Sequence, residues 1–412
     1  MKMIFAGASI LALSIAAPAF AQATTPAACT AATGNCSAIE QSGDGQSATI
    51  SQTGSNDVSG IVQEDFDNLA DVNQGGLNGS LSTIAQSGST ATLGNEARVS
   101  QTDTGLLIDP DDFSNESEIV QDGQSNLAFV RQVHDDLFDP TLQNTSNITQ
   151  SDGLNDADVR QSGAGLVSTV VQTTISNTAT VIQGEELDLG FANTSSIIQG
   201  GIDGSGGGGN VATVRQFAVD PEFAVFNDSR IIQNGQANIA DVTQSGNSNT
   251  STIKQDGDNA EAQVVQSGVN FPDGGTDNPS SATINQEGIG SLAYIEQVGV
   301  GNTATINQAF AADGTTVNGG NDNEAAVFQL GNDNTSTITQ GIGSDNDAYL
   351  LQTGNDNTST ITQLGGTNSA TVYQTSNGNT SSISQTGNGN AVTVTQGAAP
   401  ASIPTSPLPS TP

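Results

Sequence analysis

"NTSTITQLGGTNSATVYQ", residues 357–374, holds two near-copies of one seven-residue phrase, Asn-x-Ser/Ala-x-Ile/Val-x-Gln. The copies begin eleven residues apart, and almost every residue in them is polar. A single segment of this composition has too little apolar surface to fold by itself. Repetition changes that expectation, because stacked repeats together bury a core that one repeat cannot bury.

The phrase recurs along most of the chain. Aligned on its final Gln, it occurs 28 times between Gln41 and Gln396, and 17 of the 27 gaps are eleven residues. Ile or Val stands two residues before the Gln in 27 copies, and Asn stands six before it in 21. Four residues before the Gln, 12 of the 14 odd copies carry Ser and 13 of the 14 even copies carry Ala; the exceptions are Ala282, Ala304 and Val392. The unit is therefore two phrases, about 22 residues, repeated 14 times.

Each phrase predicts a short β-strand, since its recurring residues alternate with variable ones at a period of two. The intervening x-Gly-x-x segments, as in "QTGNDN" (352–357), predict tight reversals in which Gly permits a positive φ. Two strands and two turns make one coil. The predicted fold class is all-β, a two-sheet β-solenoid (β-helix) of about 14 two-strand coils in cross-β stacking at about 4.8 Å. Ser-type strands would form one sheet and Ala-type strands the facing one.

In such a stack, identical inward residues of successive coils lie above one another. Ile and Val rows form the dry strip, and Asn and Gln amides hydrogen-bond along the axis, which satisfies polar groups that would be costly to bury singly. In the last coils the predicted ladder positions are Asn334, Ile338, Gln340, Asn346, Gln352, Asn357, Ile361, Gln363, Asn368, Val372, Gln374, Asn379, Ile383, Gln385, Asn390, Val394 and Gln396. The competing interpretation is a disordered Asn/Gln-rich tract, but disorder does not require the Ser/Ala alternation.

The charge pattern excludes several classes of function. The chain of 412 residues has 43 acidic and 7 basic side chains, a net charge of −36, and no Trp. The basic residues are scattered singly, whereas nucleic-acid binding needs clustered cations. The one histidine, His134, stands in the insertion "QVHDDLFDP", where a solvated loop residue is favoured over a general base. The sequence therefore predicts a protein that is no enzyme, needs no cofactor or metal and binds no nucleic acid.

The two ends differ in composition from the repeats. Residues 1–21 are predicted to be a Sec-type signal peptide, with Lys2, an apolar stretch over 4–17 and the cleavage site Ala19-Phe20-Ala21. The apolar stretch is shorter than the ~20 residues of a membrane span, and no later segment qualifies. The predicted organisation continues with an N-terminal segment (22–34), the repeat solenoid with acidic loop insertions (35–397) and a Pro/Ser/Thr-rich, extended tail (398–412).

Both cysteines follow the predicted cleavage site, in "CTAATGNC". In the oxidising compartment of an exported protein, a local disulfide between Cys29 and Cys36 is the favoured interpretation. A metal pair would need two further soft ligands nearby, and the sequence has none there.

Eight of the gaps between phrases run from 15 to 21 residues. Each insertion falls between a Gln and the next strand, so it is expected to enlarge a turn without changing the strand order. One of them, "TDTGLLIDPDDFS" (102–114), carries Asp109, Asp111 and Asp112. Weak Ca²⁺ binding is conceivable there, but the spacing matches neither an EF-hand nor a Ca²⁺-binding nonapeptide, so solvated acidic loops are favoured.

The two-strand unit, Ser leading into Ile/Val-x-Gln-x-Gly and then Asn-x-Ala-x-Val-x-Gln, resembles the curlin repeat over residues 35–396. The resemblance implies a secreted, extracellular subunit that polymerises with itself into curli, the functional amyloid fibres of biofilms, for matrix formation and surface adhesion. It also implies an outer-membrane curli secretion channel and a nucleating minor curlin as partners. By the same resemblance, Asn and Gln residues act as assembly positions; here these are Asn357, Gln363, Asn368, Gln374, Asn379 and Gln385.

Three features depart from typical curlins. The repeats are far more numerous, the acidic loops are long, and residues 22–36 do not match the region that targets curlins for secretion. The Cys29–Cys36 loop and the Pro-rich tail could also cap the two ends and leave a monomeric rod. Two alternatives follow, an ice-binding solenoid with a flat Thr array (Thr335, Thr337, Thr339, Thr358, Thr360, Thr362) or a non-polymerising adhesin that uses its loops.

Overall fold

The computed structural model describes residues 34–76, 79–88, 93–103, 114–134, 142–184, 190–200, 208–217, 226–268, 279–309 and 320–398. The predicted signal peptide, Cys29, the Asp109 to Asp112 stretch and the tail from residue 399 onward lie outside these ranges. Everything that follows about the structure concerns the described residues.

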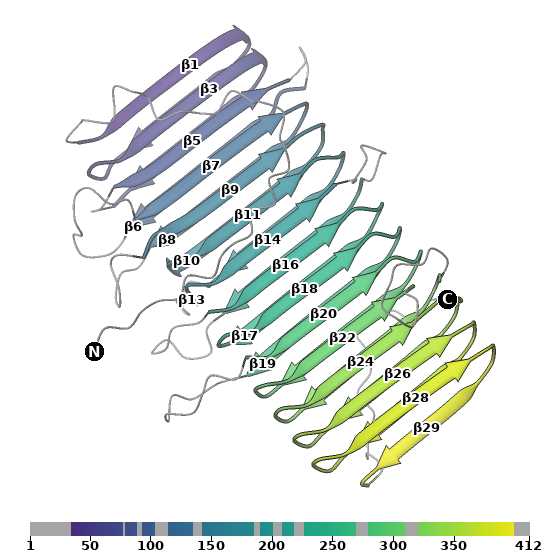
Figure 1. The fold of residues 1–412 in the computed structure, drawn as a ribbon. Coiled ribbons are helices and arrows are strands. Elements are labelled where there is room, and N and C mark those ends of the chain that lie inside the picture. Colours follow the sequence, from purple (N-terminus) through teal and green to yellow (C-terminus); the bar gives the residue numbers. More distant parts are fainter. Residues whose placement is uncertain are drawn as a thin grey trace, which may run out of the picture.

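All regular structure in the described ranges is β, arranged as two parallel sheets that run the length of a rod (Figure 1). The chain alternates between the sheets, so each strand pairs with the strand one coil further on. The first sheet, here called the Ser sheet, contains β1 (Cys36–Asp44), β3 (Val58–Phe66), β5 (Ser80–Ser87), β7 (Asn115–Asp122), β9 (Asn144–Gln150), β11 (Val167–Gln172), β14 (Thr194–Gln199), β16 (Asp228–Gln233), β18 (Thr250–Gln255), β20 (Ser281–Gln286), β22 (Thr303–Gln308), β24 (Thr335–Gln340), β26 (Thr358–Leu364) and β28 (Thr380–Thr386).

The second sheet is called the Ala sheet. It contains β2 (Ser47–Gln52), β4 (Leu69–Gly75), β6 (Glu96–Asp103), β8 (Leu127–His134), β10 (Asp156–Ala164), β12 (Thr178–Gln183), β15 (Val211–Phe217), β17 (Ile239–Gly246), β19 (Glu261–Gly268), β21 (Leu292–Val298), β23 (Glu324–Leu330), β25 (Asp347–Gln352), β27 (Ser369–Gln374) and β29 (Ala391–Gln396). The two-residue strand β13 (Gly190–Phe191) lies off this path and pairs with β10.

The register confirms the predicted two-sheet solenoid. In each sheet the phrases align residue for residue, so that Gln lies beside Gln and the small residue beside the small residue. Ala282 and Ala304, the two odd copies that lack Ser, still lie in the Ser sheet, where they pair with Ser251 and Ser336. The insertions leave the strand order unchanged, because β18 still pairs with β20 and β22 with β24.

One apolar core runs along the rod between the sheets. It is built from the Ile row of the Ser sheet, the mainly Val row of the Ala sheet and the small Ala residues, and nearly all of these side chains are at most 2% exposed. Full burial of an Ile or Val side chain contributes roughly 1.5–3 kcal/mol to folding. The core thins at the N-terminal coil, where Ile39 is 46% exposed.

Glycines form a column at the corner where the chain leaves the Ala sheet. A Cβ placed on Gly246, Gly268 or Gly299 would lie 1.8, 2.2 or 2.2 Å from the carbonyl oxygen of the next glycine in the column. Gly246 and Gly299 also have positive φ values of 100° and 114°, a region that other residues rarely adopt. The close spacing of the coils is therefore what requires glycine at this corner.

We expect Gly299→Ala to lower the free energy of unfolding by about 1–3 kcal/mol or more, because the new Cβ strains the backbone and clashes with the carbonyl oxygen of Gly331. Chemical denaturation of the monomer, compared with the outward-facing control Thr303→Ala, measures the effect. Equal unfolding midpoints for the two variants would contradict the corner argument.

Candidate self-assembly interface

The last residue of every phrase is a Gln whose amide bonds to the same Gln of the next coil. In the Ser sheet, Nε2 of each Gln donates to Oε1 of the next one along an unbroken row from Gln41 to Gln385, at 2.7–3.1 Å. In the Ala sheet an equivalent row runs from Gln52 to Gln396, at 2.8–3.0 Å. Both rows point in one direction, since the donor is always on the N-terminal side.

The second amide proton crosses to the facing sheet. Nε2 of Gln255, in the Ser sheet, donates to the carbonyl oxygen of Ile239 at the start of a strand in the Ala sheet, 3.0 Å away. Gln266 and Gln363 make the same bond to Thr250 and Asp347. Each buried Gln therefore ties its own coil together and also fixes the register of the next coil.

The Asn residues six before each Gln form a second pair of rows, directed the other way. The backbone N–H of Asn357 donates to Oδ1 of Asn334 at 3.1 Å, and that of Asn379 donates to Asn357 at 2.9 Å. Asn368 and Asn390 repeat the pattern in the Ala sheet. Amide-to-amide bonds from Nδ2 accompany these contacts in the C-terminal coils.

The Gln and Asn residues predicted as ladder positions of the last coils lie in these rows, and the predicted Ile and Val residues lie in the apolar core. From Asn334 to Gln385 most of them are fully buried, whereas Asn390, Val394 and Gln396 in the last coil are partly exposed. Their part in assembly between molecules stays a prediction, because the contacts described here lie within one molecule.

Both ends of the rod present strand edges with no partner strand in the described ranges. The ends also carry unfinished ladders. No donor in the described ranges reaches Oε1 of Gln41 or Gln52 at the N-terminal end. At the C-terminal end, Gln396 uses Nε2 for one bond, to Thr380, and has no next Gln.

A family model of the curlin associated repeat matches residues 235–268, 319–341, 342–365 and 367–397. These four segments of the chain are curlin associated repeats. The matched repeats lie in the C-terminal part of the rod, where the phrase is most regular. The resemblance to the curlin repeat that the sequence indicated is confirmed for these segments. A comparison with curated proteins gives no match.

Curlin repeats form a structural family. Two other kinds of feature were searched for in the described part of the chain, a metal site and a membrane-spanning helix. No group of three or more His, Cys, Asp or Glu side chains there is placed to hold a metal ion. None of its segments is a helix long and apolar enough to cross a membrane. Cys36, at the start of β1, is disulfide-bonded. Cys29 lies outside the described residues, so the Cys29–Cys36 pairing stays a prediction.

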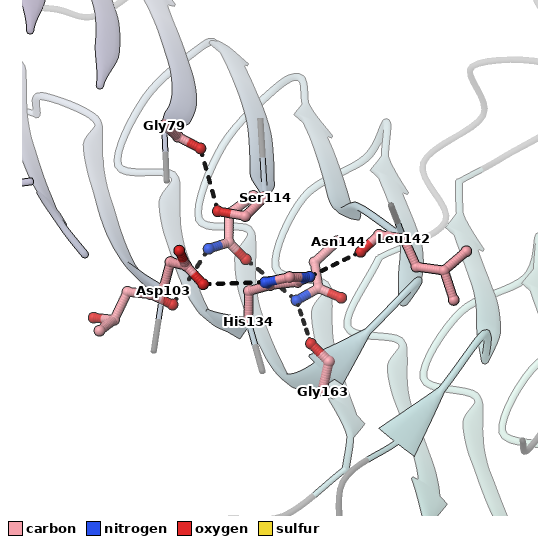
Figure 2. Close-up of polar contacts among 9 residues, drawn as sticks. Gly79, Asp103, Ser114, His134, Leu142, Asn144 and Gly163 are labelled. Atoms are coloured by element: carbon pink, nitrogen blue, oxygen red, sulfur yellow. Dashed lines mark hydrogen bonds and ion pairs between the residues drawn. The ribbon is translucent and has the colours of Figure 1, made fainter. Parts of the chain in front are cut away.

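The expectation that His134 is a solvated loop residue is wrong, since its side chain is fully buried. His134 follows Gln132 by two residues and continues β8, so the period of two points it inward at the corner. Figure 2 shows the ring between Asp103 and Leu142: Nδ1 lies 3.2 Å from Oδ1 of Asp103, and Nε2 lies 2.9 Å from the carbonyl oxygen of Leu142. A neutral ring has one N–H and donates to only one of these oxygens, whereas a protonated ring donates to both.

Like His134, Asp57 is a buried titratable residue that the alignment of the repeated phrases did not predict. It occupies an Asn-row position in the second coil and is fully buried. Its Oδ1 accepts the N–H of Ser80 and its Oδ2 that of Gly54, both at 3.2 Å. Burial, with a smaller contribution from the nearby charge of Asp103, outweighs the lowering by the two N–H donors and raises the pKa of Asp57 from 3.8 to about 6. The one signal in the sequence was an Asp where most copies have Asn.

We expect Gln255→Ala to lower the free energy of unfolding by about 2–5 kcal/mol, because two neighbouring Gln amides and the carbonyl of Ile239 each lose a buried partner. The matched control is Thr252→Ala on the outer face of the same strand. Hydrogen exchange of β16, β18 and β20 locates the effect. Unchanged protection of these strands would refute a stabilising ladder.

We expect Asp57→Asn to stabilise the protein at pH 8 and to have little effect below pH 4. The raised pKa means that the folded state holds its proton up to about pH 6, so the wild type loses stability as pH rises from about 4 through 6. The difference is at most about 3 kcal/mol. Melting temperatures of both proteins between pH 4 and 8 test this; parallel pH profiles would contradict it.

Proposed function

We propose that this protein is exported and polymerises end to end into curli-like amyloid fibres at the cell surface, contributing to biofilm matrix and adhesion. The observation that carries the proposal is the pair of rod ends, where none of the described strands pairs with the outer edges of β1, β2, β28 and β29. Each end exposes a strand edge from both sheets, and such edges template the addition of another chain. The match to the curlin associated repeat supports the same conclusion.

The direction of the Gln rows favours head-to-tail addition. The C-terminal end offers Nε2 of Gln385 and Gln396, and the N-terminal end offers Oε1 of Gln41 and Gln52. Stacking β1 of one copy on β28 of another, and β2 on β29, joins donors to acceptors and keeps all strands parallel. A head-to-head contact would place acceptors against acceptors. A head-to-tail contact is heterologous and does not close, so it generates a filament.

Charge opposes this addition without blocking it. The net charge of −36 makes the molecules repel one another, and salt or a lower pH weakens that repulsion. The predicted partners of the pathway, a nucleating minor curlin and an outer-membrane curli channel, belong to the same proposal. A nucleator would supply the first parallel edge, which is the step that repulsion slows most.

A second candidate, ice binding, is favoured by one observation. Outward threonines of successive Ser-sheet strands stack in register: Thr303, Thr335 and Thr358 form one row, and Thr305, Thr337 and Thr360 form the next. The array is regular, although Thr339 beside it is only 8% exposed. Ice recrystallisation assays on the monomer separate this candidate from the first.

The decisive experiment uses prolines at the C-terminal edge. Immediately before β28 and β29, the carbonyl oxygens of Asn379 and Asn390 accept hydrogen bonds from the preceding coil. Because alternate residues of a parallel strand face opposite neighbours, the N–H groups of Ser382 and Thr393 point away from that coil, toward the open edge. We expect Ser382→Pro with Thr393→Pro to fold normally, to fail to elongate, and to stop wild-type fibre growth at substoichiometric amounts, because its N-terminal end still adds.

Thioflavin fluorescence and electron microscopy of residues 22–412, with and without seeds, provide the readout. The control Ser382→Ala with Thr393→Ala should form fibres like the wild type, with a reflection near ~4.8 Å. A soluble wild-type monomer that ignores seeds would refute polymerisation. A proline variant that elongates freely would refute head-to-tail growth through these edges.

A further inference from the structure

The outer face of the Ala sheet carries a row of four aromatic side chains near the C-terminal end of the rod. They are Tyr294 on β21, Phe328 on β23, Tyr349 on β25 and Tyr373 on β27, and successive ring centroids lie 5.3, 5.4 and 5.9 Å apart. The chain has three tyrosines in all, and each of them belongs to this row. The phenol groups of the whole protein are therefore concentrated on one face of the rod.

Two of the three tyrosines are in direct ring contact. The rings of Tyr349 and Tyr373 are inclined at 55° with their centroids 5.9 Å apart, which is within the usual range for an aromatic pair. The two residues lie on neighbouring strands, because Tyr349 pairs with Thr371 in the register and Tyr373 stands two residues further along β27. At this separation the ring edges approach van der Waals contact, so small torsional changes bring the two rings together.

The third tyrosine has a different environment. Tyr294 contacts Phe328, which has no phenol oxygen, and its side chain is only 5% exposed. Its hydroxyl donates to Oε2 of Glu296 at 2.9 Å. Tyr349 and Tyr373 are instead half-buried, so solvent reaches part of each side chain. The row thus holds one pair of accessible phenols in contact and one covered phenol without a tyrosine in contact.

Two phenols held in contact can be joined by oxidation. A phenol that loses one electron and one proton becomes a phenoxyl radical, whose unpaired electron is shared with the ring carbons beside the C–O carbon. Two such radicals couple through these carbons, Cε1 or Cε2 in tyrosine, to give dityrosine. Holding both partners in place favours this coupling strongly over an encounter between separate molecules. A Phe ring has no phenol to oxidise, so the contact between Tyr294 and Phe328 does not lead to the same product.

The electrostatics of the pair agree with a close approach of the two phenol groups. Burial raises the pKa of the Tyr349 phenol above its usual range, and repulsion from an ionised Tyr373 and from Glu296 adds to the rise. The phenol of Tyr349 therefore keeps its proton at neutral pH and gives it up only together with an electron. Solvent at the half-buried ring takes that proton.

We propose that Tyr349 and Tyr373 form an intramolecular dityrosine cross-link when hydrogen peroxide and a haem peroxidase act on the folded chain. Each tyrosine gives up one electron and one proton, and a carbon–carbon bond forms between the two rings. Hydrogen peroxide takes up both electrons and both protons and becomes two molecules of water. The new bond links β25 to β27 around the intervening strand β26, so it joins two successive coils covalently. The proposal concerns the monomer and does not depend on polymerisation.

The test oxidises dilute monomer of residues 22–412 with hydrogen peroxide and a haem peroxidase. Dityrosine fluorescence and the mass of the intact chain follow the reaction, and peptide mapping locates the bond. The variants are Tyr349→Phe and Tyr373→Phe, and the matched control is Tyr294→Phe. All three keep a ring in the row, so the packing of the face is preserved. Wild-type chain unfolded in urea is oxidised in the same way.

We expect the wild type and Tyr294→Phe to lose two hydrogen atoms, to elute as monomers and to yield a joined pair of peptides containing residues 349 and 373. Dityrosine fluorescence should fall to near background in Tyr349→Phe and Tyr373→Phe, and should be several times weaker in the unfolded chain. A folded monomer that gains oxygen without losing hydrogen overturns the proposal. So do cross-links found only in dimers, equal yields from folded and unfolded chain, or a joined pair that contains residue 294.

Discussion

The buried glutamine amide is the interaction on which the rest of the structure depends. A Gln side chain in an apolar interior is costly unless both amide protons and the oxygen are satisfied. Here the next coil takes one proton, the facing sheet takes the other, and the preceding coil supplies a donor to the oxygen. None of these partners exists in an isolated repeat. The residue that makes one repeat unstable alone is therefore the residue that holds repeats together.

The same constraint explains where the repeat tolerates variation. Ser229 and Ser251 in the inward Ser row have buried hydroxyls without a hydrogen-bond partner, so the hydroxyl contributes little there. Replacement by Ala at positions 282 and 304 in the same row leaves the sheet intact. No Gln position varies in this way. Insertions are also tolerated, because they lie between a Gln and the next strand and do not interrupt either amide row.

The period of two, the Ser/Ala alternation and the glycines of the turns were enough to predict both sheets of the solenoid. Local exceptions were harder to predict. His134 was assigned to a solvated loop because it stands in an insertion, whereas the strand continues two residues past Gln132 and buries it. The aromatic contacts on the outer face of the Ala sheet were not predicted at all, since Tyr294, Phe328 and Tyr349 occupy two different outward positions and approach only through diagonal contacts between coils.

The charged exceptions show what the amide rows require. Asp57, Asp103 and His134 are buried charged or titratable groups in the first third of the rod, and each lies at a corner and not in a Gln row. Other acidic residues, such as Glu118 and Asp347, stand on outward strand positions. A charge in a Gln row would repeat every coil at about 4.8 Å and repel its neighbours without screening by water. A neutral amide with both donor and acceptor groups avoids that repulsion and still satisfies the backbone. In the described part of the chain the charged side chains lie on the surface and at corners, outside the Gln rows, and this placement lets the coils stack although the chain carries a net charge of −36.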